Sequence, residues 1–117
     1  MRALRDLLVT GAEPRSFSVS ITEYEYRDFA LLDVMASGCS KGSAVAEWVA
    51  LGGYPRAEVM AIGDNLNDLE MLEFAGLPIV MGNAAPSLRA RANGWRFTGT
   101  NDEAGVAAAI QEHILGR

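Results

Sequence analysis

The spacing of hydrophobic residues predicts a helix and a hairpin in the first third of the chain. Apolar and polar positions alternate over 17–24, with Phe17, Val19 and Ile21 on one face, which is typical of a strand. A short charged turn then leads into the apolar stretch 29–36, which is predicted to be a second strand paired with the first. Leucines at i, i+3 and i+4 in residues 2–9 predict an amphipathic helix, which Gly11 and Pro14 end. We therefore expect a helix followed by an antiparallel β-hairpin.

The pattern changes after Ser37 to an alternation of helices and strands. Ser40 is a typical N-cap, and the helix it starts is expected to turn Val45, Trp48 and Val49 inward. The elements expected from here on are helix 41–51, strand 58–62, helix 67–75, strand 77–81, helix 86–92, strand 95–98 and helix 102–115, the last capped by Asn101-Asp102. Because such alternation gives parallel strands with right-handed crossovers, the predicted fold class is α/β, with about three parallel strands and flanking helices.

Composition narrows the range of partners. The chain has 117 residues, which is enough for one domain with a modest core, and a formal net charge of −5, so a nucleic-acid partner is not expected. No apolar run approaches the roughly 18 residues that cross a bilayer, and Asp6 makes the N-terminus a poor signal peptide. The single cysteine, Cys39, excludes an internal disulfide and favours a cytoplasmic setting.

The stretch EVMAIGDNLNDLEMLE concentrates the polar chemistry of the chain. A short apolar run ends at Gly63, and Asp64, Asn65, Asn67 and Asp68 follow before helical spacing resumes. Carboxylates just past the end of a strand lie where open α/β sheets bind ligands. The alternative is an ordinary strand-to-helix loop capped by Asp and Asn.

These side chains suit a divalent cation and a phosphate. Mg²⁺ is typically held by one or two carboxylates together with substrate phosphate, so Asp64 and Asp68 are candidate metal ligands. The amide of Asn67 could donate to a phosphoryl oxygen. Lys41, which opens a helix, would be well placed if an anion lay between it and the first backbone N–H groups, although a solvated surface lysine is the simpler alternative.

Four separated blocks then carry a family resemblance. SKG, GDNLNDLEML, AGLPIVMGNA and NDEAGVAAAI together resemble the haloacid dehalogenase (HAD) phosphohydrolases, and more narrowly the Cof-type, subclass IIB sugar-phosphate phosphatases. The resemblance covers about residues 29–115. It implies a Rossmann-like core with a mobile cap, Mg²⁺ as cofactor, a phosphorylated small-molecule substrate, and phosphoryl transfer to an aspartate nucleophile followed by hydrolysis.

The resemblance also implies a role for each of six residues. In catalysis Lys41 would neutralise the phosphate and the nucleophile, Asp64 would bind Mg²⁺, and Asp68 would orient the metal shell. The remaining three would contact the phosphate (Asn67), allow a close approach (Gly63) and brace the neighbouring loop (Asn83).

The chain also departs from this family. The family begins with a strand ending in D-x-D-G, whose first Asp is the nucleophile, and no D-x-D occurs in this sequence. By resemblance, residues 1–36 are the C-terminal remnant of a cap and 37–117 the C-terminal half of the core. We therefore expect no appreciable phosphatase activity from this chain alone.

Two other interpretations remain open. The chain could be a non-catalytic, HAD-derived module that binds phosphate or a protein, or a separate chain could bring the nucleophile. An in-frame D-x-D-G segment upstream of Met1 would favour the interpretation that this chain is a fragment of an enzyme.

The missing half has a structural consequence. In the family's sheet, the strand matching 58–62 lies beside the nucleophile strand, so here it would become an apolar edge. We expect homo-oligomerisation through this edge, or coverage of the edge by the 17–36 hairpin.

Overall fold

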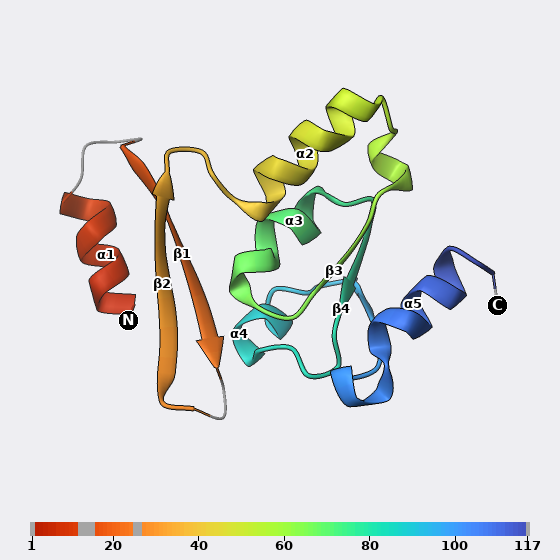
Figure 1. Cartoon of the computed structure of the whole chain (residues 1–117). Helices are drawn as coiled ribbons and strands as arrows, with labels where there is room; N and C mark the ends of the chain where they lie inside the picture. Colours follow the sequence, from red (N-terminus) through yellow and green to blue (C-terminus); the bar gives the residue numbers. More distant parts are fainter. Residues whose placement is uncertain (1, 12–15, 25–26, 117) are drawn as a thin grey trace.

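A computed structural model describes residues 2–11, 16–24 and 27–116. Its first part is helix α1 (Arg2–Gly11) followed by strands β1 (Phe17–Tyr24) and β2 (Phe29–Ala36), which lie beside the rest of the chain in Figure 1. The two strands pair antiparallel from Phe17↔Ala36 to Tyr24↔Phe29, so the predicted hairpin is confirmed with its expected bounds. Pro14 and half of the predicted turn lie outside the described residues.

The second part is an α/β unit. Its elements are α2 (Lys41–Gly52), the 3-10 turn η1 (Arg56–Glu58), β3 (Met60–Gly63), η2 (Leu66–Asp68), α3 (Leu69–Phe74), β4 (Leu77–Val80), α4 (Pro86–Arg89), β5 (Arg96–Phe97), η3 (Asn101–Glu103) and α5 (Gly105–His113). The strands form a parallel sheet in the order β3-β4-β5, with Ile62 opposite Ile79 and Val80 opposite Phe97. The predicted fold class, three parallel strands with flanking helices, is confirmed.

Local capping explains where the helix boundaries differ from those expected. Ser40 caps α2 as predicted, because its side chain accepts a hydrogen bond from the backbone N–H of Ser43. The predicted Asn101-Asp102 cap is wrong. Thr100 and Glu103 instead form a capping box around η3, and Ala104 then adopts a left-handed backbone (φ 54°), so α5 starts only at Gly105.

The core lies between the sheet and the helices α3 and α4. The largest fully buried side chains are Leu72, Ile79, Val80 and Leu88. Trp95 packs against this cluster, as expected.

The inward position expected for Trp48 is wrong, because its side chain is 69% exposed. Trp48 lies on α2 next to the edge strand β3, and no further strand in the described part of the chain covers it. Its neighbour is the ring of Tyr54, with the two centroids 6.4 Å apart.

A close contact between α2 and α3 sets the position of Lys41. A Cβ on Gly42 would lie 2.6 Å from the Cβ of Glu70, so only glycine allows the first turn of α2 to approach α3 this closely. The approach brings the side chain of Lys41 over the loop after β3. Among the helices of the described ranges, none combines the length and hydrophobicity needed to cross a membrane.

Candidate functional site

The candidate site lies at the C-terminal end of β3, where the chain turns into η2. Gly63 ends the strand, and a Cβ at this position would lie only 2.6 Å from the Cβ of Asp68. The absence of a side chain on Gly63 therefore lets Asp68 fold back beneath the end of the strand. This is the edge at which parallel sheets commonly bind ligands.

The carboxylate of Asp68 holds the loop together. Its Oδ2 accepts hydrogen bonds from the backbone N–H groups of Asp64 (2.9 Å) and Asn65 (3.2 Å). Its Oδ1 pairs with the Nζ of Lys41 at 2.5 Å. Asp68 is 4% exposed, so this charge is buried but fully partnered, as a buried carboxylate requires.

Asp64 lies beside this pair, and the pKa of its carboxyl group is raised. Partial burial is the main cause, the negative charge of Asp68 and a hydrogen bond with its side chain add to it, and the positive charge of Lys41 opposes it. Asp64 remains exposed to solvent. An exposed carboxylate that is destabilised by a neighbouring negative charge is a suitable ligand for a cation.

The described residues contain no group of three or more His, Cys, Asp or Glu side chains that could hold a metal ion. The donor set at this site is Asp64, with Asp68 behind it. One or two carboxylates can bind Mg²⁺ when water molecules and a substrate phosphate supply the remaining ligands of the ion.

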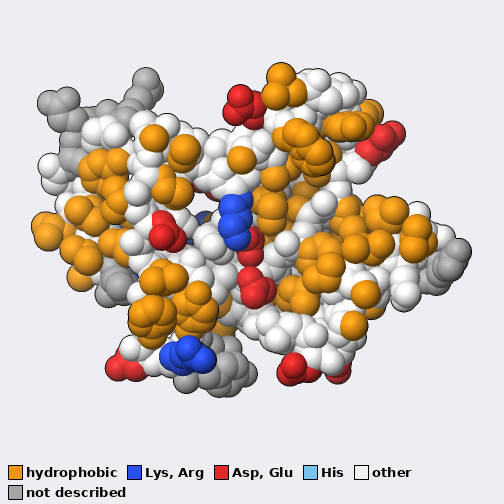
Figure 2. Space-filling model, in the orientation of Figure 1, with side chains coloured by type: hydrophobic (Ala, Val, Ile, Leu, Met, Phe, Trp, Pro, Cys, Tyr) orange, Lys and Arg blue, Asp and Glu red, His pale blue; other side chains and the backbone are white. Residues whose placement is uncertain are grey.

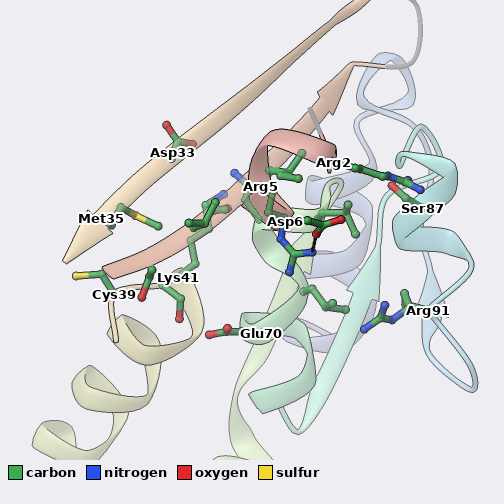
Figure 3. A pocket seen from close by; sticks show the side chains of 18 of the residues that line it. Arg2, Arg5, Asp6, Asp33, Met35, Cys39, Lys41, Glu70, Ser87 and Arg91 are labelled. Atoms are coloured by element: carbon green, nitrogen blue, oxygen red, sulfur yellow. Dashed lines mark ion pairs between the residues drawn. The ribbon is translucent and has the colours of Figure 1, made fainter. Parts of the chain in front are cut away.

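Lys41 and Asn67 line the same cavity, which has a volume of about 760 Å³. Figure 3 shows its walls: Lys41 enters from α2, Glu70 from α3, and Asp33 and Met35 from β2. Ser87 lines it from α4, and Arg91 from the turn that follows α4. The space-filling view shows a hollow between the hairpin and the α/β unit, with basic and acidic side chains along it (Figure 2). The cavity thus lies between the two parts of the chain, and both polar and apolar side chains line it.

Asn83 lies in the next loop, after β4. Its Oδ1 accepts a hydrogen bond from the backbone N–H of Asn101 at 2.9 Å, which joins the loops that follow β4 and β5. Of the six residues singled out in the sequence, Lys41, Gly63, Asp64, Asn67 and Asp68 therefore gather around the end of β3, whereas Asn83 lies one loop further along the sheet.

Sequence reasoning missed the contact between Asn65 and Glu23. The amide of Asn65 is buried, donates to the carbonyl oxygen of Glu23 (2.6 Å) and accepts from its N–H (3.0 Å). The density of amides after β3 marked Asn65 as a capping residue, but no spacing rule indicates a partner 42 positions away.

The chain is an α/β protein with charged and amide side chains at the carboxyl end of a parallel strand, which is where proteins with such sheets bind their ligands. The family model for haloacid dehalogenase-like hydrolases matches residues 13–110. The chain belongs to this family, which confirms the family resemblance seen in the sequence.

Similarity to known proteins narrows the relationship to phosphatases. The chain is 46% identical over 85 residues to the putative phosphatase YxeH of Bacillus subtilis, an alignment that covers 73% of this chain and 31% of YxeH. A HAD-like hydrolase structure from B. subtilis superposes with a TM-score of 0.73 at 28% identity, over 97% of this chain and 37% of the other. A HAD subclass IIB sugar phosphatase superposes with a TM-score of 0.65 at 29% identity, over 80% and 34%. The chain thus spans about a third of the length of these proteins.

The raised pKa of Asp64 gives a testable pH dependence of stability. The folded chain holds the Asp64 proton more tightly than the unfolded chain, whose carboxyl titrates near 3.8, so ionisation lowers the free energy of unfolding as pH rises above that value. Asp64→Asn should therefore unfold at a higher urea concentration than wild type at pH 7. The difference should shrink as the pH falls toward 3.8. Asp28→Asn removes an exposed carboxylate elsewhere and serves as the control; equal midpoints for Asp64→Asn and wild type at pH 7 would contradict the assignment.

Proposed function

We propose that this chain is the lysine- and carboxylate-bearing part of a Mg²⁺-dependent phosphohydrolase that acts on phosphate monoesters of the sugar-phosphate type. One observation carries the proposal: the buried Asp68 carboxylate holds the Nζ of Lys41 at 2.5 Å, beside Asp64, while Lys41 and Asn67 share one cavity. The subclass IIB sugar phosphatase with a similar fold supports the substrate class. The single cysteine supports a cytoplasmic setting.

Lys41 is the anion-binding group in this proposal. Its side chain is half exposed, so the ammonium group can keep one hydrogen bond to Asp68 and direct the others into the cavity. A phosphate dianion there would receive a charge-assisted hydrogen bond from Lys41 and a second bond from the amide of Asn67. The bond to Asp68 fixes the ammonium group before the anion arrives, which lowers the entropy lost on binding.

Asp64 is the proposed metal ligand, and Asp68 acts behind it. Both oxygens of Asp68 are already engaged by Lys41 and by loop N–H groups, which suits a role in orienting the loop around the metal shell. Bound Mg²⁺ would neutralise charge on the phosphate. The raised pKa of Asp64 supports this role, because a cation relieves the repulsion between the two carboxylates.

The chain alone is proposed to be inactive as a phosphatase. Its sequence contains no D-x-D pair, so neither the aspartate nucleophile nor its acid-base partner is present. Removing a nucleophile from an intact hydrolase typically lowers turnover by about a million-fold. The remaining groups can bind and neutralise a phosphate but do not attack phosphorus.

A non-catalytic module is the second candidate. It is favoured by the same geometry, because Lys41 and Asn67 line one cavity and require no catalytic partner to hold an anion. In that case phosphate binding would itself be the function, and self-association or protein binding would occur through the edge of the sheet.

The phosphate site can be tested with inorganic phosphate and Mg²⁺. Lys41 is the sole lysine of the sequence, so selective isotope labelling gives a single side-chain NMR signal. This signal should shift on titration, and Lys41→Met should weaken binding about tenfold to hundredfold, the usual effect of losing a hydrogen bond to a charged group. Arg96→Met, which removes an exposed cation on β5, should bind as wild type does. An unperturbed lysine signal at saturating phosphate would rule the site out.

Turnover provides an independent check of inactivity. With p-nitrophenyl phosphate and Mg²⁺, the purified chain should release p-nitrophenol no faster than a buffer blank, because the attacking carboxylate is absent. Turnover that disappears in Asp64→Ala would show that another group of this chain attacks phosphorus, and would refute this part of the proposal.

We also propose that the chain self-associates through the edge of β3. In the described residues β3 pairs only with β4, and the hairpin forms a separate sheet, so the alternative in which the hairpin covers this edge is not what the structure has. Since β4 bonds to the carbonyl groups of Val59 and Gly63, the alternating backbone groups of Met60 and Ile62 face outward.

The surface beside this edge is apolar. A cavity of about 430 Å³ lies between α2 and β3, and Trp48 and Tyr54 line it. Hydrophobic side chains gather over α2 and over the adjoining part of the sheet in Figure 2. A second copy related by a two-fold axis offers the same open strand and the same apolar surface, so the pairing is self-complementary.

Sedimentation velocity tests this association. At tens of micromolar the chain should sediment as a dimer or larger species, and Trp48→Lys should weaken association about tenfold by placing a charge against the apolar surface. Val106→Lys is the matched control, because Val106 is also exposed but lies on α5 and does not line the cavity. A strictly monomeric wild-type profile would count against the proposal.

A further inference from the structure

Glu23 connects the hairpin to the α/β unit through both its backbone and its side chain. Its carbonyl oxygen and N–H bind the side-chain amide of Asn65. One carboxylate oxygen accepts a hydrogen bond from Ser87 on α4 (3.0 Å), and the other pairs with Arg2 on α1 (3.3 Å). The end of β1 is therefore linked to two loops or helices of the core that come much later in the chain.

The contact with Asn65 has the geometry of strand pairing. In an antiparallel ladder, successive residues alternately face the partner strand and the outer side. Both backbone groups of Glu23 bind Asn65, so they face away from β2, and the free edge of β1 is occupied by a side chain. A carboxamide offers the same donor and acceptor as a peptide group, and Asn65 here takes the place of one residue of a third strand.

Asn65 also belongs to the candidate phosphate loop. Its backbone N–H donates to Asp68, and its Oδ1 also accepts from the N–H of Leu66 at 2.9 Å. Asn65 is 8% exposed, so these groups have little water to replace a lost partner. A shift of the hairpin would thus disturb the loop that carries Asp64, and a shift of the loop would release the hairpin.

We propose that Asn65 is a positioning residue that couples docking of the hairpin to the geometry of the Asp64–Asp68 loop. The hairpin forms one wall of the cavity that Lys41 and Asn67 line, through residues such as Ser18 and Ser20. In this proposal the hairpin docks against the α/β unit and the Asp64–Asp68 loop becomes ordered in the same step. Because coupling between two sites is reciprocal, an anion that orders the loop must also tighten the hairpin. The first part of this inference needs no phosphate binding and goes beyond the proposed function.

Amide hydrogen exchange of Glu23, measured by NMR, tests the coupling without a ligand. In Asn65→Ala the Glu23 N–H loses its acceptor and should exchange about tenfold faster than in wild type. The N–H of the neighbouring Thr22 faces β2 in the hairpin register and should keep its exchange rate. Asn67→Ala, a change two positions along the same loop, should leave the Glu23 rate unaltered.

A second variant keeps the test decisive if Asn65→Ala does not fold. Asn65→Asp replaces the donor to the Glu23 carbonyl oxygen with a carboxylate oxygen, and the two oxygens repel each other, so the contact with Glu23 is weakened although an acceptor for its N–H remains. Glu23 should then exchange faster than in wild type, while Thr22 stays protected. An unchanged Glu23 rate in the folded variants would overturn the inference.

Inorganic phosphate with Mg²⁺ tests the second part, which rests on the proposed function. Saturating phosphate should slow exchange of Glu23 in wild type and have no such effect in Asn65→Ala. If the Lys41 signal shifts on titration but Glu23 exchange in wild type does not slow, the reciprocal coupling is refuted. If the Lys41 signal never shifts, the phosphate site itself fails, and the comparison without ligand still decides the role of Asn65.

Discussion

The buried carboxylate of Asp68 is the interaction on which the rest of this site depends. It joins three segments at once: Lys41 comes from α2, the N–H groups of Asp64 and Asn65 come from the loop after β3, and Asp68 itself ends η2 and directly precedes α3. A carboxylate that is 4% exposed is costly to bury unless every lone pair is used. That requirement forces the loop into one shape, and this shape presents Asp64 to solvent and Asn67 to the cavity.

Two glycines make the arrangement sterically possible. Gly63 leaves room for Asp68 beneath the strand end, and Gly42 lets α2 approach α3 at Glu70. A larger residue at either position would push the lysine and the carboxylate apart, and overpacking of this kind typically costs about 1–3 kcal/mol. The distance from Lys41 to Asp68 therefore depends both on the charges of the loop and on the close packing of α2 against α3.

Local features of the sequence predicted much of this structure. The hairpin followed from the alternation over 17–24 and the apolar stretch after the charged turn, and the cap of α2 followed from Ser40. The grouping of Lys41 with Asp64, Asn67 and Asp68 followed from the family resemblance. Features set by distant partners could not be predicted in this way. Trp48 has the spacing of a core residue, yet the sheet ends at β3 and leaves it exposed.

Asn65 shows the same limit of prediction, because it has a distant partner that its local sequence does not indicate. Its sequence context fits an ordinary cap, and it does accept the N–H of Leu66, so the local interpretation is correct but incomplete. Its remaining hydrogen-bonding capacity is used by Glu23, and only the tertiary structure brings that strand edge within reach. A polar side chain with more donors and acceptors than its cap requires must find partners elsewhere when it is buried. In this chain the partner is a strand of the hairpin, and the loop that would hold phosphate is therefore joined directly to the wall of the cavity that would enclose it.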